Sequence, residues 1–323
     1  MKLVVTAPTR ISLFGGGTDI PVFYEKYGGL VISMAINIRQ RFWLEFNERV
    51  KGNVQFVYPQ YSSPIFYDSV LKFFDSTPTK FVSEFEGKFN SGLGSSASAL
   101  VALTAALSYA KGIYLTKAEI AERAWDIEVN KLNLFGGKQD QYRSANGGFG
   151  TLEFQTSRDA KIVKPQIVDN SWPKFIGEFW SKRLMLFFIG KTREDPKVQD
   201  GLKKLTAEKA LALLNIKQIA EKAQTVMYLK DVSRTADLLN ESWEAKKKSN
   251  SVTNEQIDKI YDLALKSGAL AGKLNGSGQG GFMTFLVEPD KQNDVRRALQ
   301  SVDCIWYNFD IDHNGVEVRE IPE

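Results

Sequence analysis

The segment Ser91–Ala97, with the sequence SGLGSSA, combines two glycines, adjacent hydroxyls and the start of a long apolar run. Because Gly92 and Gly94 carry no Cβ, the backbone there can turn its N–H groups toward one point. A helix that begins at this point adds the partial positive charge of its N-terminus. The segment therefore predicts a phosphate-binding loop, with Ser95 and Ser96 placed to cap the helix or to reach a metal ion. The alternative is an ordinary turn with a capping serine.

Two carboxylates follow this segment. On a helix expected over 117–132, Glu128 falls on the apolar stripe. A carboxylate on a buried face is costly unless it is paired or binds a cation, so Glu128 is a candidate metal ligand. Asp140 follows in a glycine-rich stretch, with Lys138 as a basic neighbour. A structural ion pair and a turn-capping aspartate are the alternatives, since such pairs also place carboxylates in this way.

Two further glycine-rich segments carry possible chemistry. Gly15–Gly17 follow a predicted strand that contains Arg10, and they precede Asp19, whose carboxylate can accept two hydroxyl donors. A glycine-rich hairpin turn is the alternative there. The loop Asn275–Gly281 matches a dinucleotide fingerprint by its letters, but it follows a helix and precedes a strand. Because the fingerprint needs the reverse order, dinucleotide binding is excluded, and no lysine-bearing P-loop is present.

Composition limits the function classes. The 323 residues are 43% hydrophobic and 25% charged, with a net charge of +4, which favours a globular protein that binds small anionic ligands over one that binds nucleic acid. The single cysteine, Cys304, and the absence of a membrane-length apolar run lead us to expect a cytoplasmic location. The single histidine, His313, has no second histidine or cysteine near it in the sequence, which argues against a zinc site and against a histidine-based triad. The run Glu244–Lys248 is expected to be a solvated helix end, because basic residues are favoured near a helix C-terminus.

The elements that must position these residues are strands first and helices second, in both halves of the chain. This order predicts an α+β fold with a boundary near residue 180. The expected strands include 3–5, 11–14, 31–36, 41–46, 184–189 and 282–287, and the expected helices are 96–111, 117–132, 200–229, 232–248 and 254–273.

Taken together, the motifs resemble the GHMP kinases, the superfamily of galactokinase, homoserine kinase, mevalonate kinase and phosphomevalonate kinase. Arg10–Asp19 is similar to the sugar-binding motif of galactokinase, Ser91–Ala97 to the ATP-phosphate loop, and Asn275–Gly281 to the second glycine loop. The resemblance implies an N-terminal domain like ribosomal protein S5 domain 2, residues 1–180, and a ferredoxin-like C-terminal domain, residues 181–323. It places the substrates in the cleft between them.

The same resemblance implies a role for each matching residue. Asp140 would deprotonate or orient the acceptor hydroxyl, and Arg10 would keep Asp140 ionised. Mg2+ would be bound by Glu128 and by Ser96 (or its neighbour Ser95). The residues implied to surround the ATP phosphates are Ser91, Gly92, Leu93, Gly94, Ser95, Ser96 and Ala97. Those implied to contact the acceptor are Gly16, Gly17, Thr18, Asp19, Lys138, Arg193, Gly276, Ser277 and Gly278.

Within the superfamily, the segments Gly15–Asp19 and Gly137–Gln141 are most similar to D-glycero-D-manno-heptose 7-phosphate kinases, with fucokinase-like enzymes next. This implies transfer of a phosphoryl group from ATP to the anomeric hydroxyl, giving a 1,7-bisphosphate. A cationic pocket is then expected for the phosphate already present, with candidates Lys138, Arg143, Lys191 and Arg193. The alternatives are an anomeric kinase of an unphosphorylated sugar (fucose, galactose or an N-acetylhexosamine) and a non-catalytic ATP or sugar sensor on the same fold. No nucleic-acid or membrane partner is expected.

Overall fold

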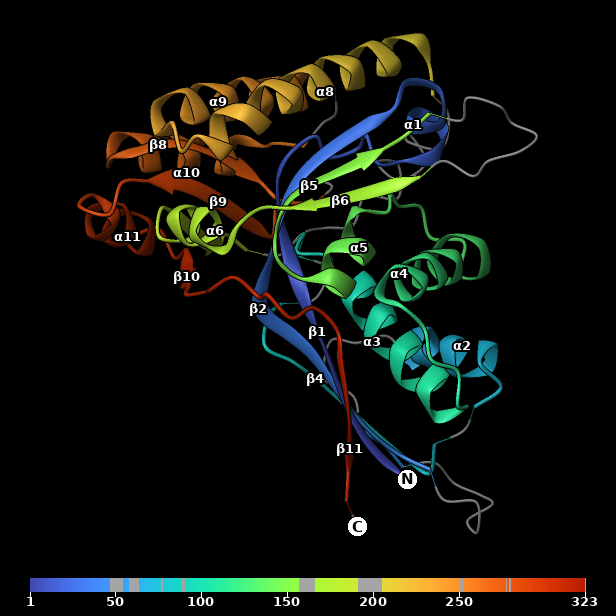
Figure 1. Ribbon diagram of the computed structural model, residues 1–323. Helices are drawn as coiled ribbons and strands as arrows, with labels where there is room; N and C mark the ends of the chain where they lie inside the picture. Colours follow the sequence, from blue (N-terminus) through green and yellow to red (C-terminus); the bar gives the residue numbers. More distant parts are fainter. Residues whose placement is uncertain are drawn as a thin grey trace.

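Two β-sheets and the helices packed on them form the protein (Figure 1). The structure is a computed structural model that describes residues 1–46, 55–57, 64–76, 78–88, 91–156, 166–190, 205–249, 252–276, 278 and 280–322. The predicted α+β class is confirmed, since strands and helices occur in both halves of the chain. None of the helices within these residues combines the length and the apolar character that a membrane crossing requires.

The larger sheet has the order β11-β1-β2-β4-β3, with β5 and β6 attached to β2. Its strands are β1 (Lys2–Phe14), β2 (Gly29–Glu45), β3 (Gln55–Val57), β4 (Lys80–Phe85), β5 (Phe149–Phe154), β6 (Ile167–Ser171) and β11 (Glu317–Ile321). β2 is long enough to have two partners on one side: its first half pairs with β5 and its second half with β4. β1 pairs with the other side of β2 along almost its whole length, so β1 and β2 are the central strands of the larger sheet.

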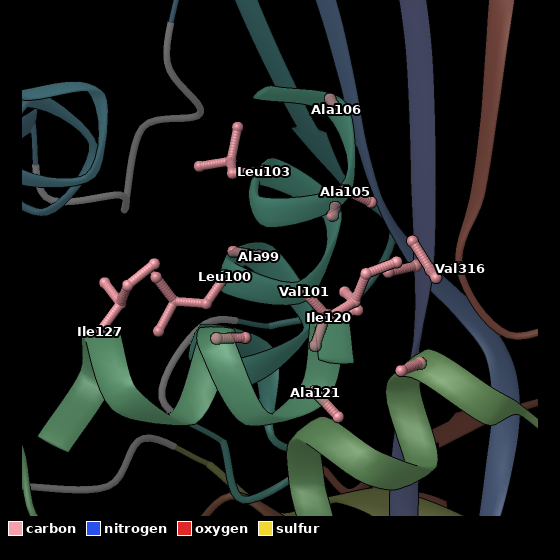
Figure 2. Packing of buried hydrophobic residues seen from close by; sticks show 14 of the residues in the cluster. Ala99, Leu100, Val101, Leu103, Ala105, Ala106, Ile120, Ala121, Ile127 and Val316 are labelled. Atoms are coloured by element: carbon pink, nitrogen blue, oxygen red, sulfur yellow. The ribbon is translucent and has the colours of Figure 1, made fainter. Parts of the chain in front are cut away.

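The helices of the first half are α1 (Pro21–Tyr27), α2 (Pro64–Phe73), α3 (Ser95–Ala110), α4 (Lys117–Asp126) and α5 (Gln139–Asn146). α4 continues into a π-helical turn, η1 (Ile127–Lys131). α3 is buried almost all round, as its apolar sequence predicts, and packs between β1, β2 and the helices α4 and α5. Figure 2 shows the side chains of this core, where α3 residues such as Leu100 lie close to Ile127 and Val101 lies close to Ile120.

The smaller sheet is antiparallel, with the order β10-β7-β9-β8. Its strands are β7 (Leu184–Phe188), β8 (Ala269–Leu274), β9 (Phe282–Val287) and β10 (Ile305–Tyr307), and the helices of this half are α6 (Lys174–Ser181), α8 (Ala207–Tyr228), α9 (Val232–Ser249), α10 (Glu255–Lys266) and α11 (Gln292–Gln300). α8 and α9 pack together; α8 also contacts β1 and β2, and α9 contacts β8, so the pair joins the two sheets. The helix predicted over 254–273 is wrong at its end: it stops at Lys266, and a turn at Gly268 (φ +111°) starts β8.

The pairing of β1 with β2 shifts register between Pro8 and Thr9: Pro8 pairs with Arg39 and Thr9 with Ile36, so Asn37 and Ile38 have no partner in β1. Leu3, Val5 and Ala7 face the core beneath α3, whereas Ile11 and Leu13, which keep the same odd spacing, face the core beneath α8. The two unpaired residues of β2 mark an irregularity of the ladder at the point where β1 passes from one core to the other. Arg10 follows directly on this irregularity, and its side chain contacts Asp140 of α5.

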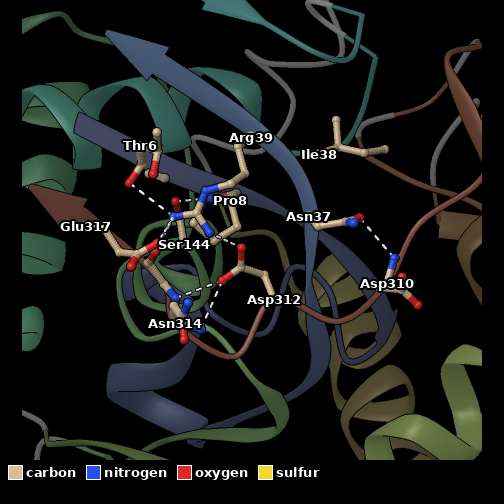
Figure 3. Close-up of polar contacts among 12 residues, drawn as sticks. Thr6, Pro8, Asn37, Ile38, Arg39, Ser144, Asp310, Asp312, Asn314 and Glu317 are labelled. Atoms are coloured by element: carbon tan, nitrogen blue, oxygen red, sulfur yellow. Dashed lines mark hydrogen bonds and ion pairs between the residues drawn. The ribbon is translucent and has the colours of Figure 1, made fainter. Parts of the chain in front are cut away.

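The C-terminal segment returns to the larger sheet, where β11 pairs with β1. The segment before β11 is held by Arg39 of β2. The guanidinium of Arg39 forms an ion pair with Asp312 and donates to the carbonyl of Gly315 at 2.6 Å (Figure 3). Val316 N donates to Ala145 O at 3.1 Å, so this segment also holds the C-terminal end of α5. The division of the chain at residue 180 stays a prediction, and β11 lies in the sheet of the first half.

Candidate active site

The segment Ser91–Ala97 forms a loop that leads directly into α3. Gly92 and Gly94 have φ of +90° and +71°, a left-handed conformation that favours glycine. Gly94 is the N-cap residue of α3, and no side chain among the described residues caps this helix. The first backbone N–H groups of α3 are therefore presented at a helix N-terminus, which is the arrangement that favours an anionic ligand.

The second glycine loop packs on this phosphate loop, backbone against backbone. A Cβ on Gly92 would lie 2.5 Å from the carbonyl oxygen of Asn275, and one on Gly276 would lie 2.4 Å from Cα of Gly92. Phe282 N donates to Ser91 O at 2.9 Å. The two loops, one from each sheet, therefore contact each other so closely that only glycine can occupy both positions. Gly278 packs on Val252, and Ser277 lies outside the described residues.

Arg10 and Asp140 form a bidentate ion pair. Nε and Nη2 of Arg10 donate to the two carboxylate oxygens of Asp140 at 2.7 and 2.6 Å, and Nη1 donates to the carbonyl of Gly92 at 2.6 Å. Asp140 lies in the first turn of α5, not in a loop. A Cβ on Gly94 would lie 2.9 Å from Oδ2 of Asp140, so this carboxylate touches the phosphate loop.

Glu128 lies in the π-helical turn η1, and its buried carboxylate faces the start of α3. Ser96 Oγ donates to Oε1 of Glu128 at 3.0 Å, and the amide of Gln141 donates to Oε2. Burial raises the pKa of Glu128 to about 7, and the negative charge of Asp140 adds to this effect. π-helical turns are frequent at functional sites because they shift one side chain out of the regular helical order.

Asp19 connects the first glycine-rich turn to α5. Its carboxylate accepts hydrogen bonds from Gly17 N and Gln139 N, both at 3.0 Å, so it caps the N-terminus of α5 from another part of the chain. The side chain is buried, and desolvation raises its pKa. A Cβ on Gly137 would lie 1.9 Å from Oδ2 of Asp19, which shows how tightly the glycine-rich stretch before α5 packs on it. Gly16 and Gly17, two of the predicted acceptor contacts, form the turn that precedes Asp19 in the chain.

Several predicted acceptor contacts already have partners within the protein. Thr18 Oγ1 donates to Gly15 O at 2.8 Å and closes the glycine turn. The ammonium of Lys138 contacts both oxygens of Glu122, at 2.8 and 2.7 Å. Arg143 is buried and donates to Gly147 O at 2.9 Å. Their roles in acceptor binding stay predictions, and Lys191 and Arg193 lie outside the described residues.

Two residues at the site have no role assigned from the sequence. Gln141 ends the segment Gly137–Gln141 that carries the resemblance, but nothing in its spacing indicates that its amide donates to Glu128. Lys246 of α9 donates to Leu274 O at 2.9 Å and to Gly276 O at 2.7 Å. The expectation of a solvated helix end is therefore wrong for Lys246. No sequence signal indicates this role, because it arises from the packing of α9 against β8.

Comparison with known proteins agrees with this geometry. Residues 67–148 match the family of GHMP kinase N-terminal domains and residues 216–303 that of GHMP kinase C-terminal domains. A D-glycero-alpha-D-manno-heptose 7-phosphate kinase of Campylobacter jejuni is 33% identical to this chain, over 98% of this chain and 99% of the relative. Two crystal structures, each with a TM-score of 0.78, are also similar. One is a D-glycero-D-manno-heptose 1-phosphate kinase of Bacteroides thetaiotaomicron (25% identity; 99% of this chain, 100% of that chain), and the other a proposed sugar kinase of Campylobacter jejuni (29%; 99% and 98%).

Fold, site and relatives together define a class of enzyme, the small-molecule kinases that transfer a phosphoryl group from ATP to an alcohol. The chain belongs to the GHMP kinases. The resemblance drawn from its three motifs is thereby confirmed for the family, the fold and the class of reaction.

Proposed function

We propose that this kinase phosphorylates the anomeric hydroxyl of D-glycero-D-manno-heptose 7-phosphate, using ATP and Mg2+, and gives the 1,7-bisphosphate. The observation that carries the chemistry is the position of Asp140, which is held by Arg10 and touches the phosphate loop at Gly94. The substrate class is supported by the full-length similarity to a heptose 7-phosphate kinase.

The reaction follows from this placement. The ATP triphosphate would lie on the N-terminus of α3, against the backbone of Gly92 and Gly94, where the helix dipole favours its negative charge. The acceptor oxygen would then attack the γ-phosphorus while the bond from that phosphorus to the bridging oxygen breaks, and ADP leaves with the bridging oxygen. The hydroxyl proton would pass to the Asp140 carboxylate. Each oxygen of that carboxylate keeps a lone pair that Arg10 does not use.

Mg2+ suits the residues that face the triphosphate position. Ser96 and Glu128 offer a hydroxyl and a buried carboxylate 3.0 Å apart, and the raised pKa of Glu128, about 7, reflects a desolvation cost that a bound cation would offset. Within the described residues there is no cluster of three or more acidic, histidine or cysteine side chains. This agrees with an ion shared between one carboxylate and the substrate phosphates. When bound, the ion would neutralise charge on the phosphate oxygens.

We propose that Asp19 binds hydroxyl groups of the acceptor. Its carboxylate accepts from Gly17 N and from the N–H of Gln139, the first residue of α5, and it therefore lies near Asp140, the next residue of that helix. Since two backbone N–H groups already bind this carboxylate, we propose that it holds the acceptor pocket in shape and contributes its remaining lone pairs to acceptor hydroxyls.

A panel of acceptors tests the proposal. Purified protein with ATP and MgCl2 is offered D-glycero-D-manno-heptose 7-phosphate, fucose, galactose and N-acetylhexosamines, and ADP release is measured for each. Phosphorus NMR of the product identifies the anomeric phosphate. The heptose 7-phosphate is expected to give the highest kcat/KM, and Asp140→Asn is expected to abolish it. A higher kcat/KM for an unphosphorylated sugar would reject the proposed substrate, and no acceptor-dependent ADP release across the panel would favour a sensor.

A further inference from the structure

The ammonium group of Lys246 lies at the second glycine loop, which packs on the phosphate loop. Its ammonium donates to Leu274 O at 2.9 Å, where β8 ends, and to Gly276 O at 2.7 Å, in the second glycine loop. Two carbonyl oxygens turned toward one point would repel a triphosphate, because the negative ends of their dipoles would face it. The ammonium offsets these two dipoles and ties the end of β8 to the loop that follows it.

A short series of contacts leads from Lys246 to the reacting groups. Gly276, which Lys246 holds, packs directly on Gly92 of the phosphate loop, so closely that a Cβ on Gly276 would lie 2.4 Å from Cα of Gly92. The carbonyl of Gly92 in turn accepts from Arg10 Nη1 at 2.6 Å, and Arg10 holds Asp140. A displacement of Gly276 would therefore move the phosphate loop and the ion pair together.

Two further cationic groups lie near the phosphate loop. Lys273, which is buried, donates to Leu13 O at 2.8 Å, and Arg10 donates to Gly92 O in the loop itself. Burial lowers the pKa of Lys246 to about 8, and the positive charge of Arg10 lowers it further in the same direction. Burial, with Lys246 and Arg10 adding to it, lowers the pKa of Lys273 well below its usual range. Arg10 is already paired with Asp140, and the lowered pKa values of the two lysines show that each feels other positive charge, which a bound triphosphate would offset.

We propose that Lys246 is a positioning residue for ATP: it holds the second glycine loop on the phosphate loop, and its charge favours the bound triphosphate. The inference rests on the proposed function only in taking the loop at Gly92 as the ATP site. It adds a side chain from α9, in the C-terminal half, to a site whose catalytic and metal-binding side chains come from the N-terminal half. It assigns Gly276, which the resemblance implied as an acceptor contact, to the nucleotide side of the site instead, because Gly276 packs on Gly92 of the phosphate loop.

The test compares Lys246→Met with Lys248→Met, an exposed lysine on the same helix. For Lys246→Met, we expect the KM for ATP and the Kd for ATP by calorimetry to rise at least about tenfold, the loss of one charge-assisted contact. The KM for the acceptor should stay within about twofold. Lys246→Arg, which keeps the charge, should restore most of the ATP affinity, and Lys248→Met should behave as wild type. Unchanged ATP affinity in Lys246→Met, or an equal effect on both substrates, would overturn the inference.

Calorimetry with ATP alone keeps this test apart from the test of the proposed function, because it needs no acceptor turnover. A wild-type protein that binds ATP but phosphorylates no sugar would reject the proposed substrate and leave the role of Lys246 measurable. If Lys246→Met does not fold, the rate of reductive methylation of each lysine in the wild-type protein is measured instead, by peptide mass spectrometry with and without ATP. ATP is expected to slow methylation of Lys246 severalfold but not that of Lys248. Equal rates with and without ATP would reject the role.

Discussion

Arg10 holds both carboxylate oxygens of Asp140, with Nε and Nη2 at 2.7 and 2.6 Å, although 130 residues separate the two in the chain. The planar guanidinium fixes the plane of the carboxylate as well as its position, which a point charge cannot do. Since Nη1 of the same group binds Gly92 O, the geometry of the base is set relative to the phosphate loop.

Replacing Arg10 by lysine tests whether the two-point contact with Asp140 is needed, because lysine keeps the positive charge but cannot donate to both carboxylate oxygens in one plane. We expect kcat to fall by about 100-fold, the usual cost of a misplacement near 1 Å at a reacting group. Steady-state kinetics with saturating ATP and acceptor measures it. The matched control is Arg41→Lys, at an exposed pair with Glu84 on the same sheet. A kcat within twofold of wild type would show that charge alone is sufficient.

Gly94 separates backbone strain from contact with Asp140. Gly94→Ala and Gly112→Ala place a side chain at the same φ of +71°, but only Gly94 has a neighbour, Oδ2 of Asp140 at 2.9 Å; within the described residues no atom lies within 4 Å at Gly112. Both should lose about 1–2 kcal/mol of unfolding free energy, measured by urea denaturation. Only Gly94→Ala should also lose kcat, by about 100-fold. Equal kcat in the two variants would contradict the contact.

The sequence predicted this site well where a residue acts through its own local segment. The helix that begins at the phosphate loop starts at Ser95, one residue from its predicted start, because a largely apolar run after two glycines favours a buried helix there. Glu128 is buried, as its place on the apolar stripe predicts. Both features follow from spacing along a single element, which periodicity describes directly.

Features that depend on the packing of distant segments could not be predicted. Arg10 follows directly on the register shift after Pro8, and a shift of this kind depends on the partner strand as well as on β1. The contact of Gln141 with Glu128 and the contact of Lys246 with the second glycine loop depend on the packing of other elements, which no spacing along the chain indicates. The end of the helix at Lys266 was missed because the following strand residues suit a buried helix equally well.

Glu128 should make stability depend on pH in protein freed of divalent cations with EDTA. Its pKa is about 7 in the folded chain and 4.5 in the unfolded chain, so the folded state binds the extra proton between these values. Its stabilisation is complete below pH 4.5 and is lost as the pH rises through 7. Between about pH 5.5 and about pH 8, wild type should lose about 2 kcal/mol of unfolding free energy relative to Glu128→Gln. Urea denaturation of both proteins measures this, and parallel pH profiles would contradict the raised pKa.

The ion pair between Arg39 and Asp312 makes a prediction about the C-terminal segment. Their side chains are 13% and 5% exposed, and Asp312 also accepts from Gly315 N at 2.9 Å. Arg39→Met would leave a buried carboxylate without its countercharge, so we expect a loss of about 3 kcal/mol of unfolding free energy.

The double variant Arg39→Met with Asp312→Asn distinguishes charge from packing. If the cost comes from the uncompensated carboxylate, removing its charge should restore part of the loss, whereas a packing defect would persist in the double variant. Arg41→Met, at an exposed pair, should cost no more than about 1 kcal/mol. Because Val316 N binds Ala145 O at the end of α5, we also expect Arg39→Met to lower kcat through the helix that carries Asp140. An unchanged kcat in the folded variant would show that α5 keeps its position without this segment.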